Sequence, residues 1–322
     1  MKPQPHRLIP LLAVPVLLLT GCGGSSSAGS GTPTTDTSAQ AATVAAATAP
    51  VRRTAAGVFV TGDLGDKPAL TIPSGAPPAA QSTEVLVTGT GATVAAGQTL
   101  VVNYLGQTWD APGGEPNIFD NTYDRAQVFG FQLGAGAVIE GWDTGLVGKK
   151  IGSRMILTIP PAQAYGEPSA ENTSELAGHT LVFVIDIVDV VGKDNVADGT
   201  PAGALPEGWP EVDSRSGKKP VIRSVSGVKE VTETTSRLLL SGTGEVIDEK
   251  KTLVLEWLQT DLATGKQTQQ TWGNAPEIVP ASDVLGVADV LKGQRIGSRA
   301  IALLPDSGSG AMIVILDVVG QY

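Results

Sequence analysis

The feature that most constrains the fold of this chain is an internal repeat. Thr-Leu-Val-Val-Asn-Tyr at 99–104 is matched 153 residues later by Thr-Leu-Val-Leu-Glu-Trp at 252–257. Lys-Ile-Gly-Ser-Arg at 150–154 is matched 145 residues later by Arg-Ile-Gly-Ser-Arg at 295–299. Three shorter matches accompany them: 65–68 with 217–220, 88–91 with 241–244, and 189–192 with 317–320. Self-similarity of this kind indicates that one structural unit occurs twice in the chain.

The repeat predicts two domains of one fold, at 54–193 and 207–322, joined by a linker at 194–206. We call these two domains the first copy and the second copy. A chain of 322 residues is long enough for two ordinary domains. The linker is rich in Gly and Pro, as connections between domains often are.

The N-terminus has the pattern of an export signal. Residues 1–21 begin with basic residues, continue through an apolar stretch at 8–19 that is too short to span a bilayer, and end in Leu-Thr-Gly. Together with Cys22 this ending resembles a bacterial lipobox, which implies a lipidated Cys22 at the extracytoplasmic face of the cell membrane. An ordinary signal peptide with an incidental cysteine is the alternative. Residues 22–53 are rich in Gly, Ser, Thr and Ala and predict a flexible tether after the lipidated cysteine.

Within each copy the pattern is mostly that of β-strands. Runs rich in Val, Ile, Leu and Thr at 99–105, 154–159 and 181–191 are bounded by Gly, Pro and Asn. The segment 138–146 differs, because its apolar residues fall at helical spacing and predict one short helix with a buried face. One short helix against an antiparallel sheet is an α+β fold.

Composition narrows the possible chemistry. The formal net charge is −10, and cleavage before Cys22 removes Lys2 and Arg7 and lowers it to −12. An acidic chain without a cluster of basic residues is a poor partner for nucleic acid. Cys22 is the only cysteine, so neither a disulfide nor a thiolate metal site can form within the chain. His6 lies in the export signal, which leaves His179 as the one histidine, and we expect neither a metal nor a cofactor.

Six short segments of the first copy form a pattern of their own. They are Val-Val-Asn-Tyr at 101–104, Phe-Asp at 119–120, Phe-Gly-Phe-Gln-Leu-Gly at 129–134, Val-Ile-Glu-Gly-Trp at 138–142, Ala-Tyr-Gly at 164–166 and Thr-Leu-Val-Phe at 180–183. Their order and spacing resemble those of the FKBP family, the immunophilin prolyl isomerases that also bind macrolides. The resemblance covers 83–191 and implies, for each copy, a bent antiparallel β-sheet wrapped around one short helix.

The resemblance also implies a set of site residues. Trp142 would form the floor of a pocket, and its polar rim would be Asp120, Arg125 and Tyr165, with Asp120 and Arg125 able to pair. The apolar walls would be Tyr104, Phe119, Phe129, Val138, Ile139 and Phe183. Taken singly, each residue has a simpler interpretation, since Trp and Phe usually belong to a core and Arg to a solvated surface. A few polar groups among apolar walls are, however, typical of a small-ligand pocket.

Such a pocket needs no nucleophile and no metal to act on a prolyl peptide bond. Rotation about an X–Pro amide has a barrier of roughly 18–20 kcal/mol, because it breaks the resonance of the planar bond. Water stabilises the planar, charge-separated form more than the twisted form, so a dry aromatic cavity favours the twisted amide. The resemblance therefore implies peptidyl-prolyl cis/trans isomerisation of exported, proline-containing polypeptides, with macrolides as further ligands and the membrane contacted through the lipid anchor alone.

The segment between Tyr165 and Phe183 departs from the family pattern. The family usually carries an Ile-Pro-Pro-type flap over the pocket at this place. Here residues 167–179 form a more acidic segment, in which Leu176 is the residue that can supply an apolar lip. This difference bears on macrolide affinity and on substrate preference.

In the second copy most of the expected pocket residues are replaced. Val287 stands at the position of Trp142, and Val284 at that of Ile139. Trp257 and Gly286 of the second copy are 29 residues apart, whereas their counterparts in the first copy, Tyr104 and Gly141, are 37 apart. We therefore expect no counterpart of the segment 119–120. The second copy is thus expected to be a structural or partner-binding module without isomerase activity.

Two other functions fit parts of the sequence. The degenerate second copy and the altered flap are compatible with a non-catalytic extracytoplasmic chaperone or protein-binding module. An exported hydrolase would have to use His179 as its base. We expect His179 to be structural instead, because the sequence suggests no partner for it.

Overall fold

The computed structural model describes residues 51–110, 117–286, 288–308 and 310–322. The expected export signal at 1–21, the lipidated Cys22 and nearly all of the tether at 22–53 lie outside these residues. The end of the tether is described, and it forms the short strand β1 (Arg52–Arg53), which pairs with β2 (Phe59–Thr61). Folded structure therefore begins slightly before residue 54. In the described part of the chain, no helix is long and apolar enough to cross a membrane.

The first copy is built on a six-stranded antiparallel sheet. Its strands are β4 (Ser82–Val87), β5 (Thr99–Thr108), β6 (Ile118–Asn121), β7 (Phe129–Gln132), β8 (Arg154–Ile159) and β9 (Leu181–Val191). The order across the sheet is β4-β8-β9-β5-β6, and β7 pairs with the part of β5 that β6 leaves free. The strands expected at 154–159 and 181–191 are confirmed, and the one expected at 99–105 extends to residue 108.

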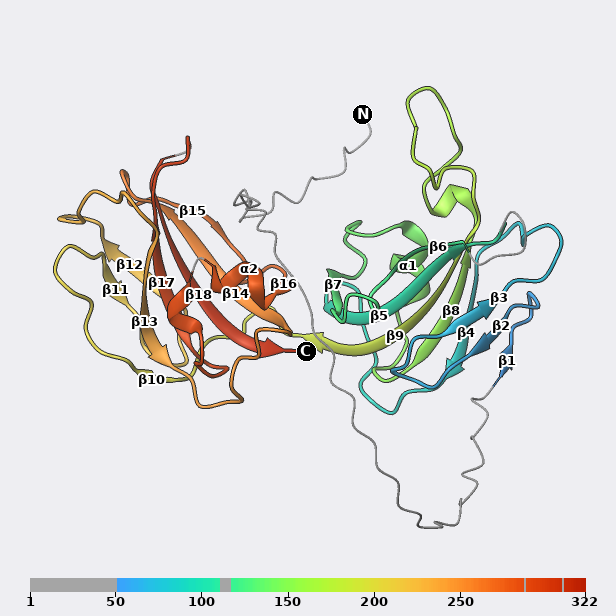
Figure 1. Cartoon of the computed structure of the whole chain (residues 1–322), viewed down its shortest axis with the longest axis horizontal. Coiled ribbons are helices and arrows are strands. Elements are labelled where there is room, and N and C mark those ends of the chain that lie inside the picture. The colour runs from blue at the N-terminus through green and yellow to red at the C-terminus, as the bar shows by residue number, and fades with distance from the viewer. Residues whose placement is uncertain (1–50, 111–116, 287, 309) are drawn as a thin grey trace, which may run out of the picture. The chain divides into compact units, whose positions relative to one another are not determined.

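The helix expected within 138–146 is α1 (Glu140–Gly145), which lies against one face of this sheet (Figure 1). Two glycines form the contact. An added Cβ on Gly141 would lie 2.5 Å from Ile159, and one on Gly145 would lie 2.8 Å from Leu157. Because neither glycine has a side chain, the helix backbone can approach β8 closely. A 3-10 turn, η2 (Pro161–Gln163), follows β8.

Both faces of the long strands are covered, which explains why their sequences are continuous apolar runs. On the face of α1, side chains of four strands and the helix form one core, which includes Leu100, Tyr104, Trp142, Leu157 and Phe183. On the opposite face, a second core joins the sheet to a small three-stranded sheet of β1, β2 and β3 (Ala69–Thr71). The first copy is therefore a sheet between two apolar layers, with its helix on one side.

The second copy has the same strand order. Its strands are β10 (Thr200–Pro201), β13 (Thr235–Ser241), β14 (Thr252–Asp261), β15 (Gln267–Gln270), β16 (Glu277–Pro280), β17 (Arg299–Leu304) and β18 (Met312–Gln321). The order β13-β17-β18-β14-β15, with β16 paired to β14, matches the first sheet strand for strand. The helix α2 (Ala281–Leu285) and the turn η3 (Asp289–Leu291) follow β16, and the pair β11 (Glu211–Asp213) and β12 (Val221–Ser224) precedes β13.

The segment 194–206, which the sequence predicts as a linker, is partly built into the second sheet. It contributes β10, which pairs with β13. Ala197 is fully buried, and its backbone N–H donates to Asp317 at 2.7 Å. An added Cβ on Gly199 would lie 2.3 Å from the carbonyl oxygen of Ser241. Glycine at position 199 is therefore explained by close packing against the sheet, and not by the flexibility of a linker.

The repeated Gly-Thr-Gly and Ile-Gly-Ser segments meet at the same place in both copies. The N–H of Gly89 donates to Ser153 Oγ at 2.9 Å, and the N–H of Gly242 donates to Ser298 Oγ at 2.9 Å. An added Cβ would lie 2.1 Å from a carbonyl oxygen of the facing segment at Gly89, and 2.3 Å from one at Gly242. Only glycine allows two backbones to approach this closely, so the two motifs recur together.

Each sheet buries one arginine–aspartate pair. Arg154 donates to Asp186 at 2.6 and 2.7 Å, and Arg299 donates to Asp317 at 2.5 and 2.7 Å. Strand pairing places these aspartates directly opposite their arginines. Asp186 is therefore the counterpart of Asp317. The shared ending Asp-Val-Val-Gly suggests Asp189 instead, and in this respect the sequence match is wrong by three residues.

The same two arginines also hold the segment upstream of each sheet. Arg154 donates to the carbonyl oxygens of Gly62 and Asp66, at 2.8 Å each, in the turn between β2 and β3. Arg299 donates to the carbonyl oxygen of Lys218 at 2.7 Å, in the turn between β11 and β12. The repeated segments 65–68 and 217–220 therefore lie in the turns that the buried guanidinium groups bind.

Candidate functional site

A hollow of about 200 Å³ lies on the helix side of the first sheet. It is lined by Tyr104, Phe119, Asp120, Phe129, Ala137, Val138, Ile139, Trp142, Tyr165 and Phe183. Nine of the ten residues that the family resemblance implies are thus brought together, and the tenth, Arg125, pairs with Asp120. Ala137 also lines the hollow, although a small residue in a loop gives no signal in the sequence.

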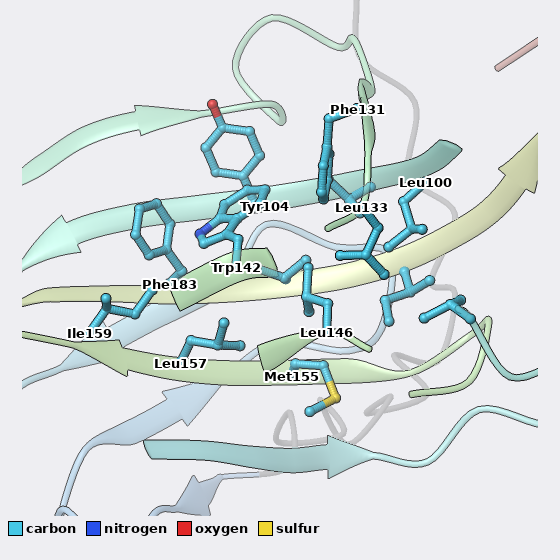
Figure 2. Packing of buried hydrophobic residues seen from close by; sticks show 14 of the residues in the cluster. Leu100, Tyr104, Phe131, Leu133, Trp142, Leu146, Met155, Leu157, Ile159 and Phe183 are labelled. Carbon is cyan, nitrogen blue, oxygen red and sulfur yellow. The ribbon is translucent and has the colours of Figure 1, made fainter. Parts of the chain in front are cut away.

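Perpendicular aromatic rings form the floor and walls of the hollow. Trp142 is 3% exposed, and its ring centroid lies 5.1 Å from that of Tyr104 and 5.1 Å from that of Phe183. Figure 2 shows the indole between these two rings, with aliphatic side chains such as Leu157 further into the core. Phe119 meets Phe183 edge to face at 5.6 Å. Rings in such contacts stabilise one another beyond their buried area, so they hold the shape of the hollow.

Gly106 on β5 makes room for two of the walls. An added Cβ at this position would lie 2.7 Å from the ring of Phe183 and 2.8 Å from the ring of Phe119. A side chain here would displace one of the rings, since real Cβ contacts are longer. Glycine inside a strand usually weakens it, but Gly106 is needed here because it gives the hollow its width.

The polar rim of the hollow is a hydrogen-bonded cluster around Asp120. Its carboxylate accepts hydrogen bonds from the Tyr104 hydroxyl and from the Arg125 guanidinium. Burial alone would raise the pKa of Asp120, but these bonds and the charge of Arg125 lower it below its ordinary value. Burial and the bond to Asp120 raise the pKa of Tyr104 to about 12. At neutral pH the rim therefore carries an ionised Asp120 paired with Arg125, beside a protonated Tyr104.

Tyr165 completes the rim from the loop after β8. Burial, followed by the charge of Asp120, raises the pKa of its hydroxyl, so it too remains a donor at neutral pH. The loop after Tyr165 is closed by a backbone bond from Gly178 N–H to Gly166 O at 2.8 Å. The side-chain amide of Asn172 donates to the carbonyl oxygens of Tyr165 and Glu167 at 2.8 and 2.9 Å. The acidic segment is thus a compact loop, and Leu176 packs against the core as its apolar contact.

His179 has a partner that the sequence did not suggest. Its Nδ1 lies 2.8 Å from Asp110 Oδ2, so the pair ties the start of β9 to the end of β5. Neither residue lines the hollow. In the part of the chain that the structure describes, no group of three His, Cys, Asp or Glu side chains could hold a metal ion.

Strand pairing identifies the residues of the second copy that correspond to the hollow. β15 takes the place of β6, so the expectation that segment 119–120 has no counterpart is wrong for the backbone. The side chains are nevertheless different. The register gives Trp257 for Tyr104, Gln259 for Gly106, Gln269 for Asp120, Glu277 for Phe129 and Val314 for Phe183. Val287, expected at the position of Trp142, lies outside the described residues.

These replacements change the character of the corresponding place. The indole N–H of Trp257 donates to Glu277 at 2.5 Å, and burial raises the pKa of this carboxyl. A hydrogen-bonded pair of an indole and a carboxyl group thus stands where the first copy has the rings of Tyr104 and Phe129. Gln259 brings a side chain to the position that must be glycine in the first copy.

The fold and the hollow define a sheet protein with a small binding site lined mainly by aromatic rings. The family model FKBP_C, described as FKBP-type peptidyl-prolyl cis-trans isomerase, matches residues 91–188. The chain is 42% identical over 125 residues to an FK506-binding protein of Streptomyces anulatus, a match that covers 39% of this chain and 98% of that protein. It is 37% identical over 123 residues to a probable FK506-binding protein of Corynebacterium glutamicum, a match that covers 38% of this chain and 98% of that protein.

The chain therefore belongs to the family of FKBP-type peptidyl-prolyl cis-trans isomerases. Among solved structures it is similar to AtFKBP13, with 28% identity and a TM-score of 0.30, and the match covers 35% of this chain and 95% of that one. The residues matched by the family model lie within the first copy.

Proposed function

We propose that the hollow of the first copy is the isomerase active site and that its substrates are X–Pro bonds of exported polypeptides. The observation that carries this proposal is that one small hollow is lined by the rings of Tyr104, Phe119, Phe129, Trp142 and Phe183. Such a space takes an apolar ring, and proline is the residue whose peptide bond isomerises most readily.

The lining explains how the bond could be turned without covalent chemistry. The prolyl ring would rest on Trp142 while the preceding carbonyl leaves the plane of the amide. In a space lined by rings, the planar and charge-separated amide loses its hydration, so the twisted amide is favoured relative to it. The protonated hydroxyl of Tyr165 at the rim is a donor for a substrate carbonyl. Each tenfold gain in rate requires about 1.4 kcal/mol of such selective stabilisation.

The rim provides the test of the active-site assignment. In the full chain, Asp120→Ala should lower kcat/KM for a proline-containing peptide about tenfold, since Tyr104 and Arg125 lose their common partner and the wall loosens. The measurement is a protease-coupled or NMR exchange assay. Gln269→Ala, at the corresponding place of the second copy, is the matched control and should leave the rate unchanged. An unchanged rate in Asp120→Ala would sink the assignment of the hollow.

The same assay extends to ligands. The relatives from Streptomyces and Corynebacterium are named for binding FK506, and we infer that the hollow of this chain takes a macrolide of that type. The compact acidic segment 167–179 replaces the usual flap, so we expect the affinity for the macrolide to differ from that of a pocket covered by a flap rich in Ile and Pro. Inhibition of the parent rate by FK506, weakened in Asp120→Ala, would place the macrolide in the hollow.

The second copy is best explained as a non-catalytic module. Its strand order is kept, while Glu277 and Val314 stand in place of the rings of Phe129 and Phe183, and Gln259 stands in place of the glycine that gives the hollow its width. A binding role for this copy, as in an extracytoplasmic chaperone, is the alternative function that the same observation favours. A slower rate in Gln269→Ala would contradict an inactive second copy.

Lipidation of Cys22 would place the enzyme at the extracytoplasmic face of the membrane. Cys22→Ala should release the protein from the membrane fraction of the producing bacterium while leaving its isomerase activity unchanged, because residue 22 precedes the described fold. Fractionation followed by detection of the protein measures this. Retention of Cys22→Ala in the membrane fraction would contradict anchoring through this residue.

A further inference from the structure

Ala137, Val138 and Ile139 form one wall of the hollow and belong to a loop that precedes α1. A residue of α1 binds the backbone of this loop. This loop runs from the end of β7 to the start of α1. Its beginning is fixed by backbone bonds, since Leu133 N–H donates to Gln98 O at 2.9 Å. Its end is fixed by the first turn of α1, where Trp142 N–H donates to Ile139 O at 2.9 Å.

The middle of this loop is bound by one carboxylate. Asp143 Oδ1 accepts the backbone N–H of Gly134 at 2.7 Å, and Asp143 Oδ2 accepts that of Gly136 at 2.8 Å. Both glycines have a left-handed backbone, with φ of 74° and 72°. An added Cβ on Gly136 would meet nothing within 4 Å, so packing does not hold the loop at that residue.

A loop with two such glycines has many conformations of similar energy, because glycine is the least restricted residue. Hydrogen bonds to a charged acceptor are stronger than those between neutral groups, and two bonds to the two oxygens of one rigid group also fix an orientation. Asp143 directly follows Trp142 in α1, so the same helix carries the floor of the hollow and the anchor of its wall.

We propose that Asp143 is a positioning residue for the isomerase reaction. It does not line the hollow. Its carboxylate fixes Gly134 and Gly136 and thereby holds the wall 137–139 at a set distance from Trp142. The proposal rests on the hollow being the active site. Catalysis by selective packing is sensitive to such placement, since displacements of about 1 Å can cost a hundredfold in rate.

The experiment compares the full chain with Asp143→Ala and Asp143→Asn. Asp143→Ala removes both bonds and should lower kcat/KM about ten- to hundredfold, and Asp143→Asn, which keeps one acceptor oxygen, should fall between it and the parent. The thermal unfolding midpoint should change little. Methyl NMR signals of Val138 and Ile139 should shift or broaden, which a merely structural effect elsewhere would not cause.

Asp248 provides a matched control. It is an exposed aspartate of the second copy whose Oδ1 accepts the backbone N–H of Lys250 at 2.9 Å. Asp248→Ala and Asp248→Asn make the same chemical changes and should leave kcat/KM and both methyl signals unchanged. The control separates loss of one surface charge from loss of the anchor.

Two results would overturn the proposal. One is a kcat/KM for folded Asp143→Ala that lies within about twofold of the parent value. Loss of about 1.4 kcal/mol of transition-state stabilisation would lower it tenfold. The other is a lower rate with unaltered signals of Val138 and Ile139. If Asp143→Ala does not fold, the same two criteria apply to Asp143→Asn. If either result is found while Asp120→Ala loses activity, only the proposed role of Asp143 is overturned. The assignment of the hollow as the active site then still stands.

Discussion

Replacing Arg154 with methionine should unfold the first copy under conditions in which the parent chain is folded, and isomerase activity should be lost with it. Arg154 is 1% exposed, and its guanidinium pairs with Asp186, which is 2% exposed. Removing one partner leaves a buried charge without compensation, which typically costs about 3–5 kcal/mol. The loss is large because a whole domain is usually stable by only about 5–15 kcal/mol. Urea unfolding and the isomerase assay measure the two effects.

Arg299→Met is the matched variant, because its guanidinium makes the same pair in the second sheet. It should destabilise the second copy by a similar amount and leave the isomerase rate of the first copy in place. A further variant that also replaces Asp186 with leucine should recover part of the stability that Arg154→Met loses, since no buried charge then remains unpaired. Equal loss of activity in Arg154→Met and Arg299→Met would show that the two copies unfold together. A fully folded Arg154→Met would contradict the assignment of the pair as a buried anchor.

The second large effect concerns Glu256, which occupies the place of Asn103 in the second copy. Its carboxyl is fully buried, with Oε2 accepting the Thr271 hydroxyl at 2.6 Å and Oε1 without a partner. Burial raises the pKa of Glu256 from its ordinary value of 4.5 to about 7. Its negative charge is thus disfavoured in the folded chain.

Because this pKa is raised on folding, the folded chain binds the proton more tightly than the unfolded chain. The contribution of Glu256 to stability is therefore greatest below pH 4.5 and is lost as the pH rises towards 7 and beyond. Over that window the loss amounts to about 3 kcal/mol, from 1.36 kcal/mol for each pKa unit. Glu256→Gln, which stays neutral, should remove this loss.

The measurement is the free energy of unfolding of the second copy at pH 5 and at pH 8. Glu256→Gln should exceed the parent by about 3 kcal/mol at pH 8 and by much less at pH 5. Comparing variant with parent at each pH cancels the opposite effect of other carboxyls, such as Asp213, whose pKa is lowered to about 2 by Arg215 and Arg223. The same pH dependence in both proteins would contradict a raised pKa for Glu256.

The sequence was informative wherever one strand or helix carries its own pattern. The strands β8 and β9 and the helix α1 were predicted because their apolar residues have the spacing of a buried element. The lining of the hollow was predicted through motifs that the family resemblance placed in order. Arg125, which the resemblance places at the rim, does not line the hollow and pairs instead with Asp120, which does.

The sequence was not informative where tertiary contacts decide the structure. The strands of the small sheets are two to four residues long, too short for a period of two to be visible. Their turns are fixed by Arg154 and Arg299 from distant parts of the chain. The anchor Asp143 was missed for a similar reason, since one aspartate near a helix start usually indicates nothing beyond a favourable dipole. β15 was missed because it keeps the backbone pairing of β6 while its side chains are all polar.

The bonds from the buried arginines to upstream turns also have a consequence for the order in which the molecule can be assembled. Asp66 precedes Arg154 by 88 residues, and Lys218 precedes Arg299 by 81. A chain that emerges amino end first from a ribosome or a translocation channel presents each small sheet long before the guanidinium that will fasten it. Synthesis of β8, and later of β17, is then the earliest moment at which the small sheet of that copy can be fastened to its main sheet. A nascent chain stopped just before either strand would keep that small sheet undocked.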